Sequence, residues 1–235
     1  MNERLKEILK KNAEFERKSP YNFCDRWCER CVYEKQVRCK LYQDELEQKI
    51  TCIAHGREPD DPEITAKVME KQYEGMKDFA DKCEEFEIDS DEDADGYEFE
   101  KIKDHIELAP NNALLRTTEE YRKRAALFLK NTLYKDAVKN SELVYDFETI
   151  AWYHTLLPVK IQRALNGFYE PVCGEEISLH DAIAQFEICK KAIEESIKAL
   201  RKIKGFYPSG LPQVTTLLVL LDNVFSRIRI MEENI

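Results

Sequence analysis

Four cysteines near the start of the chain are the residues best suited to do chemistry. They make up half of the eight cysteines in the chain and follow the pattern C-x3-C-x2-C-x7-C. The four are Cys24, Cys28, Cys31 and Cys39. Thiolates are soft ligands, and four of them can close a tetrahedral shell around Zn²⁺ or hold an iron–sulfur cluster. The spacing therefore predicts a metal site.

Structural zinc is the preferred occupant of this site, and an iron–sulfur cluster is the alternative. A closed four-thiolate zinc site needs no other group from the protein, although the spacing lacks the two C-x2-C pairs of a zinc ribbon. Cys52 and His55 lie further along the chain and are second-choice ligands that could replace one or two of the four.

The backbone between the cysteines decides whether they can share one ion. In a straight helix over residues 24–39, Cys24 and Cys31 would lie roughly 10 Å apart along the axis, at about 1.5 Å per residue. Metal binding therefore requires a turn within this segment. The alternative keeps one helix and treats the thiols as small buried apolar groups beside Trp27 and Tyr33.

The segment 24–31, CDRWCERC, resembles the cluster motif of radical S-adenosylmethionine enzymes. That resemblance would imply an iron–sulfur cluster with one open iron site inside a barrel of alternating strands and helices. Three features of the chain argue against it. Arg30 stands where that family usually has an aromatic residue, Cys39 would fill the open site, and the rest of the chain has no alternating strands. We therefore do not assign the chain to that family.

A second candidate site involves His154 on the apolar stripe of a predicted helix, with Glu148 nearby in the sequence. The Glu-x-x-His motif of di-iron bundles does not occur at any of the four histidines. We interpret His154 as a core histidine satisfied by a carboxylate or a backbone carbonyl. A metal or acid–base site is the alternative.

Two further features have a simpler explanation than a site. The stretch 91–96, DEDADG, matches the first half of a calcium-binding EF-hand loop, but the twelfth position is Ile102 instead of the bidentate glutamate. We interpret it as a solvated acidic linker with at most weak cation binding. Cys173 falls in a predicted loop, where a tolerated cysteine is the preferred interpretation and a reactive thiol the alternative.

The elements that must position these residues are predicted to be helices. Only 7 Gly and 8 Pro occur in 235 residues, too few for the turns of a sandwich or barrel. In one helix Phe186, Ile193 and Leu200 repeat every seven residues, with Cys189 and Ile203 in the neighbouring column. The predicted helices cover residues 2–18, 64–86, 112–138, 143–166, 179–204 and 211–232.

The predicted fold is therefore all-α, with an N-terminal cysteine-rich helical module followed by an antiparallel four-helix bundle. We expect three parts: residues 1–56 hold the first helix and the metal-binding module, residues 57–110 form an acidic helical or linker segment, and residues 111–235 form the bundle.

Charge and apolar runs exclude several classes of partner. The net charge is −10, and residues 41–109 alone carry −15, so binding to nucleic acid is disfavoured. The longest apolar run, residues 217–221, is far shorter than the roughly 20 residues that cross a bilayer. The first residues do not resemble a secretory signal. We therefore expect a cytoplasmic protein with reduced cysteines and no membrane segment.

Two functional hypotheses follow. The first is a non-enzymatic helical interaction or regulatory protein that is stabilised by zinc and binds another protein or a second copy of itself. The second is an iron–sulfur or other metal-dependent redox enzyme with a further site near Glu148 and His154. The first is preferred because no phosphate-binding loop, nucleophile elbow or HExxH motif occurs in the chain.

Overall fold

The computed structural model describes most of the chain as helices. Within the described residues there are helices and turns but no strand, which confirms the predicted all-α class. The helix expected over residues 64–86 lies outside the described residues except at residue 66, and the stretch 91–96 and Cys173 also lie outside. The described residues are 2–59, 61–63, 66, 109–132, 141–169, 175–206 and 212–235.

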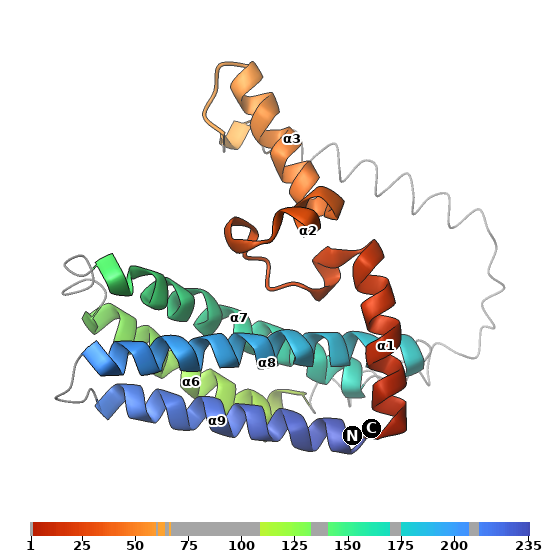
Figure 1. The fold of residues 1–235 in the computed structure, drawn as a ribbon, viewed down its shortest axis with the longest axis vertical. Coiled ribbons are helices and arrows are strands. Elements are labelled where there is room, and N and C mark those ends of the chain that lie inside the picture. The colour runs from red at the N-terminus through yellow and green to blue at the C-terminus, as the bar shows by residue number, and fades with distance from the viewer. Residues whose placement is uncertain are drawn as a thin grey trace.

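Four long helices form the largest part of the molecule, and each was expected from the sequence. They are α6 (Ala113–Thr132), α7 (Val144–Tyr169), α8 (Glu175–Phe206) and α9 (Pro212–Glu233). α6 packs against α7 and α9, and α8 packs against the same two helices, so the four surround a common core (Figure 1).

The core between these helices is apolar and closed to solvent. Phe186, Ile193 and Leu200 are fully buried, so the seven-residue repeat of α8 faces inward, as predicted. Burial of each such side chain contributes about 1.5–3 kcal/mol. Other large side chains of the core include Tyr121 and Phe128 of α6, Phe147, Ile150, Leu157 and Ile161 of α7, and Leu217, Leu221, Val224 and Ile228 of α9.

Helix α1 (Glu3–Lys18) follows its predicted bounds and crosses one end of the four long helices (Figure 1). The Asn2 side chain caps its first turn by accepting from the backbone N–H of Arg4, and the helix ends before Ser19 and Pro20. Leu5 and Ile8 of α1 join the same hydrophobic core as the long helices. The first helix is therefore attached to the four long helices by apolar packing.

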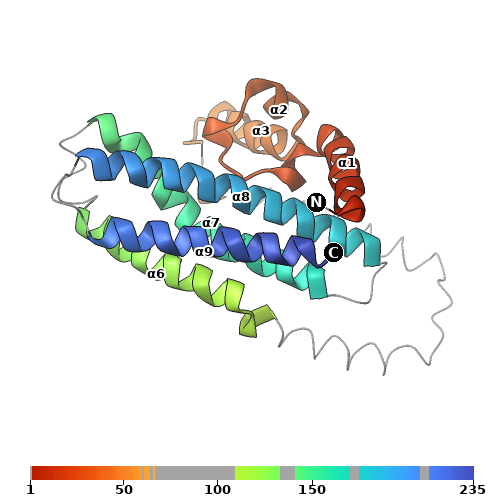
Figure 2. The same ribbon diagram turned by 60° about the horizontal axis from the view of Figure 1, so that its bottom comes forward.

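The cysteine-rich segment contains short elements separated by turns. They are η1 (Pro20–Phe23), η2 (Cys28–Arg30), α2 (Tyr33–Arg38) and α3 (Lys40–Ala54). The interpretation of residues 24–39 as one straight helix is therefore wrong, because Cys24, Cys31 and Cys39 have extended backbone between these elements. Figure 2 shows α1, α2 and α3 on the same side of the four long helices, and in Figure 1 α3 points away from them.

None of the described helices combines the length and the apolar character that crossing a membrane requires.

Candidate metal centre

The four predicted ligands line one small cavity. Cys24 follows η1, Cys28 begins η2, Cys31 follows η2, and Cys39 joins α2 to α3. All four contribute to the wall of a cavity of about 30 Å³. A volume of this size suits a single ion or water molecule, whereas organic ligands occupy several hundred Å³. The turns thus bring together thiols that are up to 15 positions apart in the sequence.

Hydrogen bonds to backbone carbonyls hold three of these cysteines in place. The N–H of Cys31 donates to the carbonyl of Cys28 at 3.1 Å, which closes the η2 turn. The Gln36 side chain donates to the same carbonyl at 2.9 Å, and the N–H of Cys39 donates to the carbonyl of Gln36 at 3.1 Å. Gln36 therefore links the η2 turn to the end of α2.

The thiols are close enough to affect one another electrostatically. Burial raises the pKa of Cys28, and negative charge on Glu45 and on the other three cysteines raises it further. Burial also raises the pKa of Cys31, and Cys24 is the neighbour that raises it most. A cation between these groups would relieve the repulsion between their thiolates.

The present arrangement is not a finished coordination shell. As placed, no three His, Cys, Asp or Glu side chains in the described part of the chain are grouped so that they could hold a metal ion. The second-choice ligands are also apart from the cavity: Cys52 is buried near the end of α3, His55 follows that helix, and neither belongs to the cavity wall.

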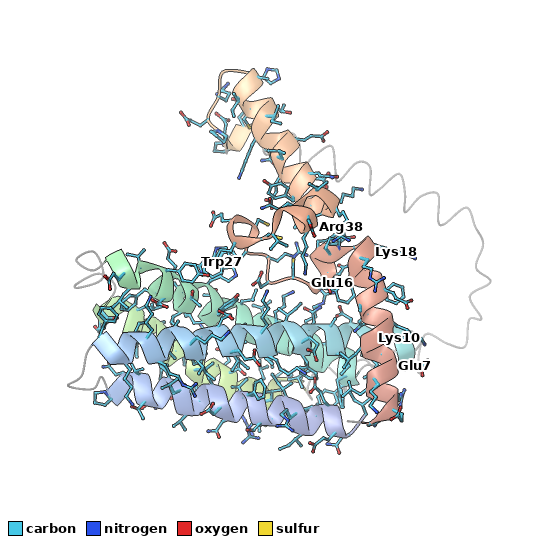
Figure 3. All side chains as sticks on the ribbon, in the orientation of Figure 1. Glu7, Lys10, Glu16, Lys18, Trp27 and Arg38 are labelled. Atoms are coloured by element: carbon cyan, nitrogen blue, oxygen red, sulfur yellow. The ribbon has the colours of Figure 1, made fainter. Side chains whose placement is uncertain are left out.

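Trp27, between Cys24 and Cys28, docks this loop onto α7. Its ring stacks on Trp152 with centroids 5.1 Å apart and meets Tyr153 edge-on at 5.7 Å. Trp27 is only 7% exposed and belongs to the hydrophobic core of the long helices. Figure 3 shows it between the cysteine-rich segment and those helices. The loop is therefore anchored by one large aromatic side chain.

Asp25 adds polar contacts to the same anchor. Its Oδ2 accepts a hydrogen bond from the Tyr153 hydroxyl at 2.7 Å, and its backbone carbonyl accepts from Trp152 Nε1 at 3.0 Å. Burial raises the pKa of Tyr153, and the hydrogen bond to Asp25 raises it further, so the hydroxyl remains a donor at neutral pH.

Arg30 completes the anchor. The central carbon of its guanidinium lies 3.4 Å from the ring centroid of Trp27 and 3.6 Å from that of Tyr145. The same group donates to Thr149 Oγ1 at 2.8 Å and to Glu148 Oε2 at 3.1 Å. No local sequence pattern indicates this role of Arg30, because its hydrogen-bond partners on α7 are more than 110 positions away.

The structure does not bring His154 and Glu148 into one site. Glu148 pairs with Arg30, whereas His154 Nδ1 lies 2.7 Å from the carbonyl of Ala151 and 3.2 Å from that of Ile150. Burial lowers the pKa of His154, so the ring is neutral at pH 7 and Nδ1 donates to these carbonyls. This agrees with the interpretation of His154 as a histidine satisfied by backbone carbonyls.

A larger cleft of about 580 Å³ lies beside the thiol cavity and was not foreseen from the sequence. Its walls come from α1, the cysteine loop, α2, α7 and α8. Glu16 of α1, marked in Figure 3, forms an ion pair with Lys35 of α2 at its edge. Four residues, Cys24, Asp25, Trp27 and Cys31, line both the cleft and the thiol cavity and so form the partition between them.

Comparisons with protein-family models, with curated proteins and with solved structures find no match to this chain. The function is therefore inferred from the chemistry of the site.

Proposed function

We propose that Cys24, Cys28, Cys31 and Cys39 bind one structural Zn²⁺ in a non-enzymatic helical interaction or regulatory protein. The observation that carries this proposal is the single small cavity that all four thiols line. Four thiolates satisfy the preference of zinc for soft, tetrahedral ligands. Burial raises the pKa of Cys28 and Cys31 most, and repulsion from neighbouring cysteines raises it further, so a positive ion would stabilise their thiolates.

Zinc binding requires the thiols to close inward, because Zn–S bonds are about 2.3 Å long. The segment is suited to this movement because its cysteines lie at turns, where small backbone rotations move a side chain farther than they can within a regular helix. Such closing couples metal binding to the folding of residues 20–54. We expect one zinc per chain and a loop that tightens when the metal binds.

Metal analysis of protein purified without oxygen tests the proposal. A colourless protein with one equivalent of zinc supports it, whereas a brown protein with visible sulfur-to-iron absorption supports the iron–sulfur alternative. Cys28→Ser and Cys31→Ser should each lower bound metal to well under one equivalent. Cys52→Ser is the matched control and should keep its metal, because Cys52 lies outside the cavity wall. Unchanged metal content in both loop variants contradicts the proposal.

The proposed interaction partner is a protein, either another chain or a second copy of this one. The support is the apolar face of α3, where Leu46, Ile50 and Ile53 are spaced for one side of a helix and are 45%, 56% and 60% exposed. Sedimentation of the zinc-loaded protein over a range of concentrations tests the second copy. A mass that rises in the wild type and not in Ile50→Glu supports self-association, and a constant monomer mass excludes it.

We further propose that the chain has two structural parts, a cysteine-rich module in residues 1–56 and an antiparallel four-helix bundle in residues 111–235, joined by residues 57–110. The support is the mutual packing of α6, α7, α8 and α9. Residues 111–235 expressed alone should be helical, with a cooperative and metal-independent thermal transition. A molten or aggregated fragment would show that Leu5, Ile8 and Trp27 are needed to complete one shared core.

We also propose that the protein is located in a reducing compartment, the cytoplasm. Zinc binds thiolates, and the four cysteines must stay reduced to remain ligands.

A further inference from the structure

The four thiols differ in their access to the large cleft. Cys24 and Cys31 line both the cleft and the thiol cavity, whereas Cys28 and Cys39 line the thiol cavity alone. The cleft, at about 580 Å³, admits small molecules much larger than water, and the thiol cavity, at about 30 Å³, does not. A small oxidant inside the cleft therefore meets Cys24 and Cys31 and neither Cys28 nor Cys39.

These two thiols are also neighbours. Among the charged groups around Cys31, Cys24 has the largest effect on its pKa. Both residues have extended backbone, one after η1 and the other after η2, and six residues separate them. A bond between their sulfurs would close a short loop that contains Asp25, Trp27 and Arg30.

That loop is the anchor described above. A disulfide draws the two sulfurs to about 2.05 Å and fixes the Cβ positions about 3.8 Å apart. The turn between them must adjust, and it carries the Trp27 ring that stacks on Trp152 and the Asp25 carboxylate that accepts from Tyr153. A change at the sulfurs is therefore transmitted to α7.

We infer that Cys24 and Cys31 form an oxidation site for hydrogen peroxide, which converts them to a disulfide, releases zinc and loosens Trp27 from α7. The release of zinc rests on the proposed metal centre, whereas the disulfide does not. One thiolate attacks a peroxide oxygen, the O–O bond breaks, and the departing hydroxide takes up a proton to give water and a sulfenic acid. The second thiolate then attacks the sulfenic sulfur, the S–S bond forms, and the hydroxyl leaves as a second water after taking up a proton. The peroxide gains the two electrons that the sulfurs lose, and the zinc loses two of its four ligands.

The test uses the full-length zinc-loaded protein and hydrogen peroxide. Zinc release is followed with a coloured chelator, and the disulfide is mapped by mass spectrometry of unreduced peptides. The tryptophan fluorescence signal is recorded in the same samples. Trp27 and Trp152 are the only two tryptophans in the chain, so the signal reports directly on their stacking. We expect one zinc released per disulfide, a bond between Cys24 and Cys31, and a changed tryptophan signal that a thiol reductant with added zinc restores.

A pair of variants tests the route through the cleft. Ala13 is exposed and lines the cleft, and its neighbour Glu14 is exposed and does not. Ala13→Phe should slow zinc release several-fold by partly filling the cleft, and Glu14→Phe should leave the rate unchanged. Equal rates in the two variants contradict the proposed route.

Failure of this inference can be told apart from failure of the zinc proposal. A disulfide that includes Cys28 or Cys39, or zinc that is retained in excess peroxide, overturns the oxidation site while the metal centre stands. Protein that never holds a metal overturns the metal centre. Mapping the disulfide in the metal-free protein then decides the oxidation site alone, because a bond between Cys24 and Cys31 supports it and any other result contradicts it.

Discussion

The four long helices and the cysteine-rich segment, residues 20–54, are stabilised in different ways. Each long helix buries several large apolar side chains completely, such as Phe128, Phe147, Phe186 and Leu221. Among the described side chains of the cysteine-rich segment, Trp27 is the large apolar one that is buried. The apolar residues that the segment exposes are Val32, Val37, Leu46, Ile50 and Ile53.

This difference explains why a metal would matter for one region and not for the other. A segment of about 35 residues cannot bury enough apolar surface to offset its conformational entropy, and such small units rely on metals, disulfides or docking. Here the docking is visible in Trp27, Asp25 and Arg30, and the proposed zinc would supply the rest. We expect the long helices to need no such support, because they share one continuous apolar core.

The largest expected difference is in the free energy of unfolding, when one large apolar side chain in each region is replaced by alanine. Phe186→Ala removes a fully buried ring from α8 and should lower the free energy of unfolding by about 3–5 kcal/mol. Ile50→Ala removes an exposed side chain from α3 and should change it by less than about 0.5 kcal/mol. Denaturant unfolding followed by circular dichroism measures both. A large loss in Ile50→Ala would show that the α3 face is already covered.

The next largest effect is expected where the two regions meet. Trp27→Ala removes the stacking on Trp152 and the burial of the ring, and should cost roughly 3 kcal/mol in the docking of the loop. Hydrogen exchange should speed up in residues 20–54, with little change in the centres of α8 and α9. Trp27→Phe keeps part of the packing and is the milder control. Uniformly faster exchange would mean that the two regions unfold as one unit.

The sequence predicted the long helices well and the anchor poorly, for a physical reason. The repeat of Phe186, Ile193 and Leu200 is local, so the side of α8 that faces the core can be read from a short window. The position of Arg30 depends on Tyr145 and Thr149, and no local pattern links residues so far apart. The clustering of the cysteines predicted a turn, but it did not show that the partition of a cleft would contain Cys24 and Cys31.

A smaller effect is expected from Arg30. Arg30→Ala loses the contacts with the rings of Trp27 and Tyr145 and the hydrogen bond to Thr149, and should destabilise loop docking by about 1–2 kcal/mol. Arg30→Lys should recover little, because an ammonium group cannot stack between two rings as a planar guanidinium does. Arg124→Ala on α6 is the matched control. It breaks only an exposed pair with Glu120, worth about 0.3–0.5 kcal/mol. Equal effects at Arg30 and Arg124 would contradict the anchor.

The smallest expected effect is that of a glycine substitution, which should raise the free energy of unfolding in the cysteine-rich segment and lower it in the long helices. Arg26 is exposed and has φ of +58°, a left-handed conformation that costs a non-glycine residue about 1–3 kcal/mol and suits glycine. Arg26→Gly relieves that strain but also increases the conformational entropy of the unfolded chain. The free energy of unfolding should therefore rise by less than about 1 kcal/mol. Arg201→Gly, at an exposed position inside α8, should lower the free energy of unfolding by about 0.8–1 kcal/mol, because glycine is a poor helix former.

The two glycine variants can be compared by their thermal midpoints and by zinc competition with a chelator. Arg26→Gly should hold zinc at least as tightly as the wild type, because the loop then reaches its closed shape with less strain. Arg26→Ala removes the same charge without relieving the backbone, so it separates strain from electrostatics. If Arg26→Gly and Arg26→Ala weaken zinc binding equally, the Arg26 side chain itself supports the site, and its left-handed backbone is not what limits the closing of the loop.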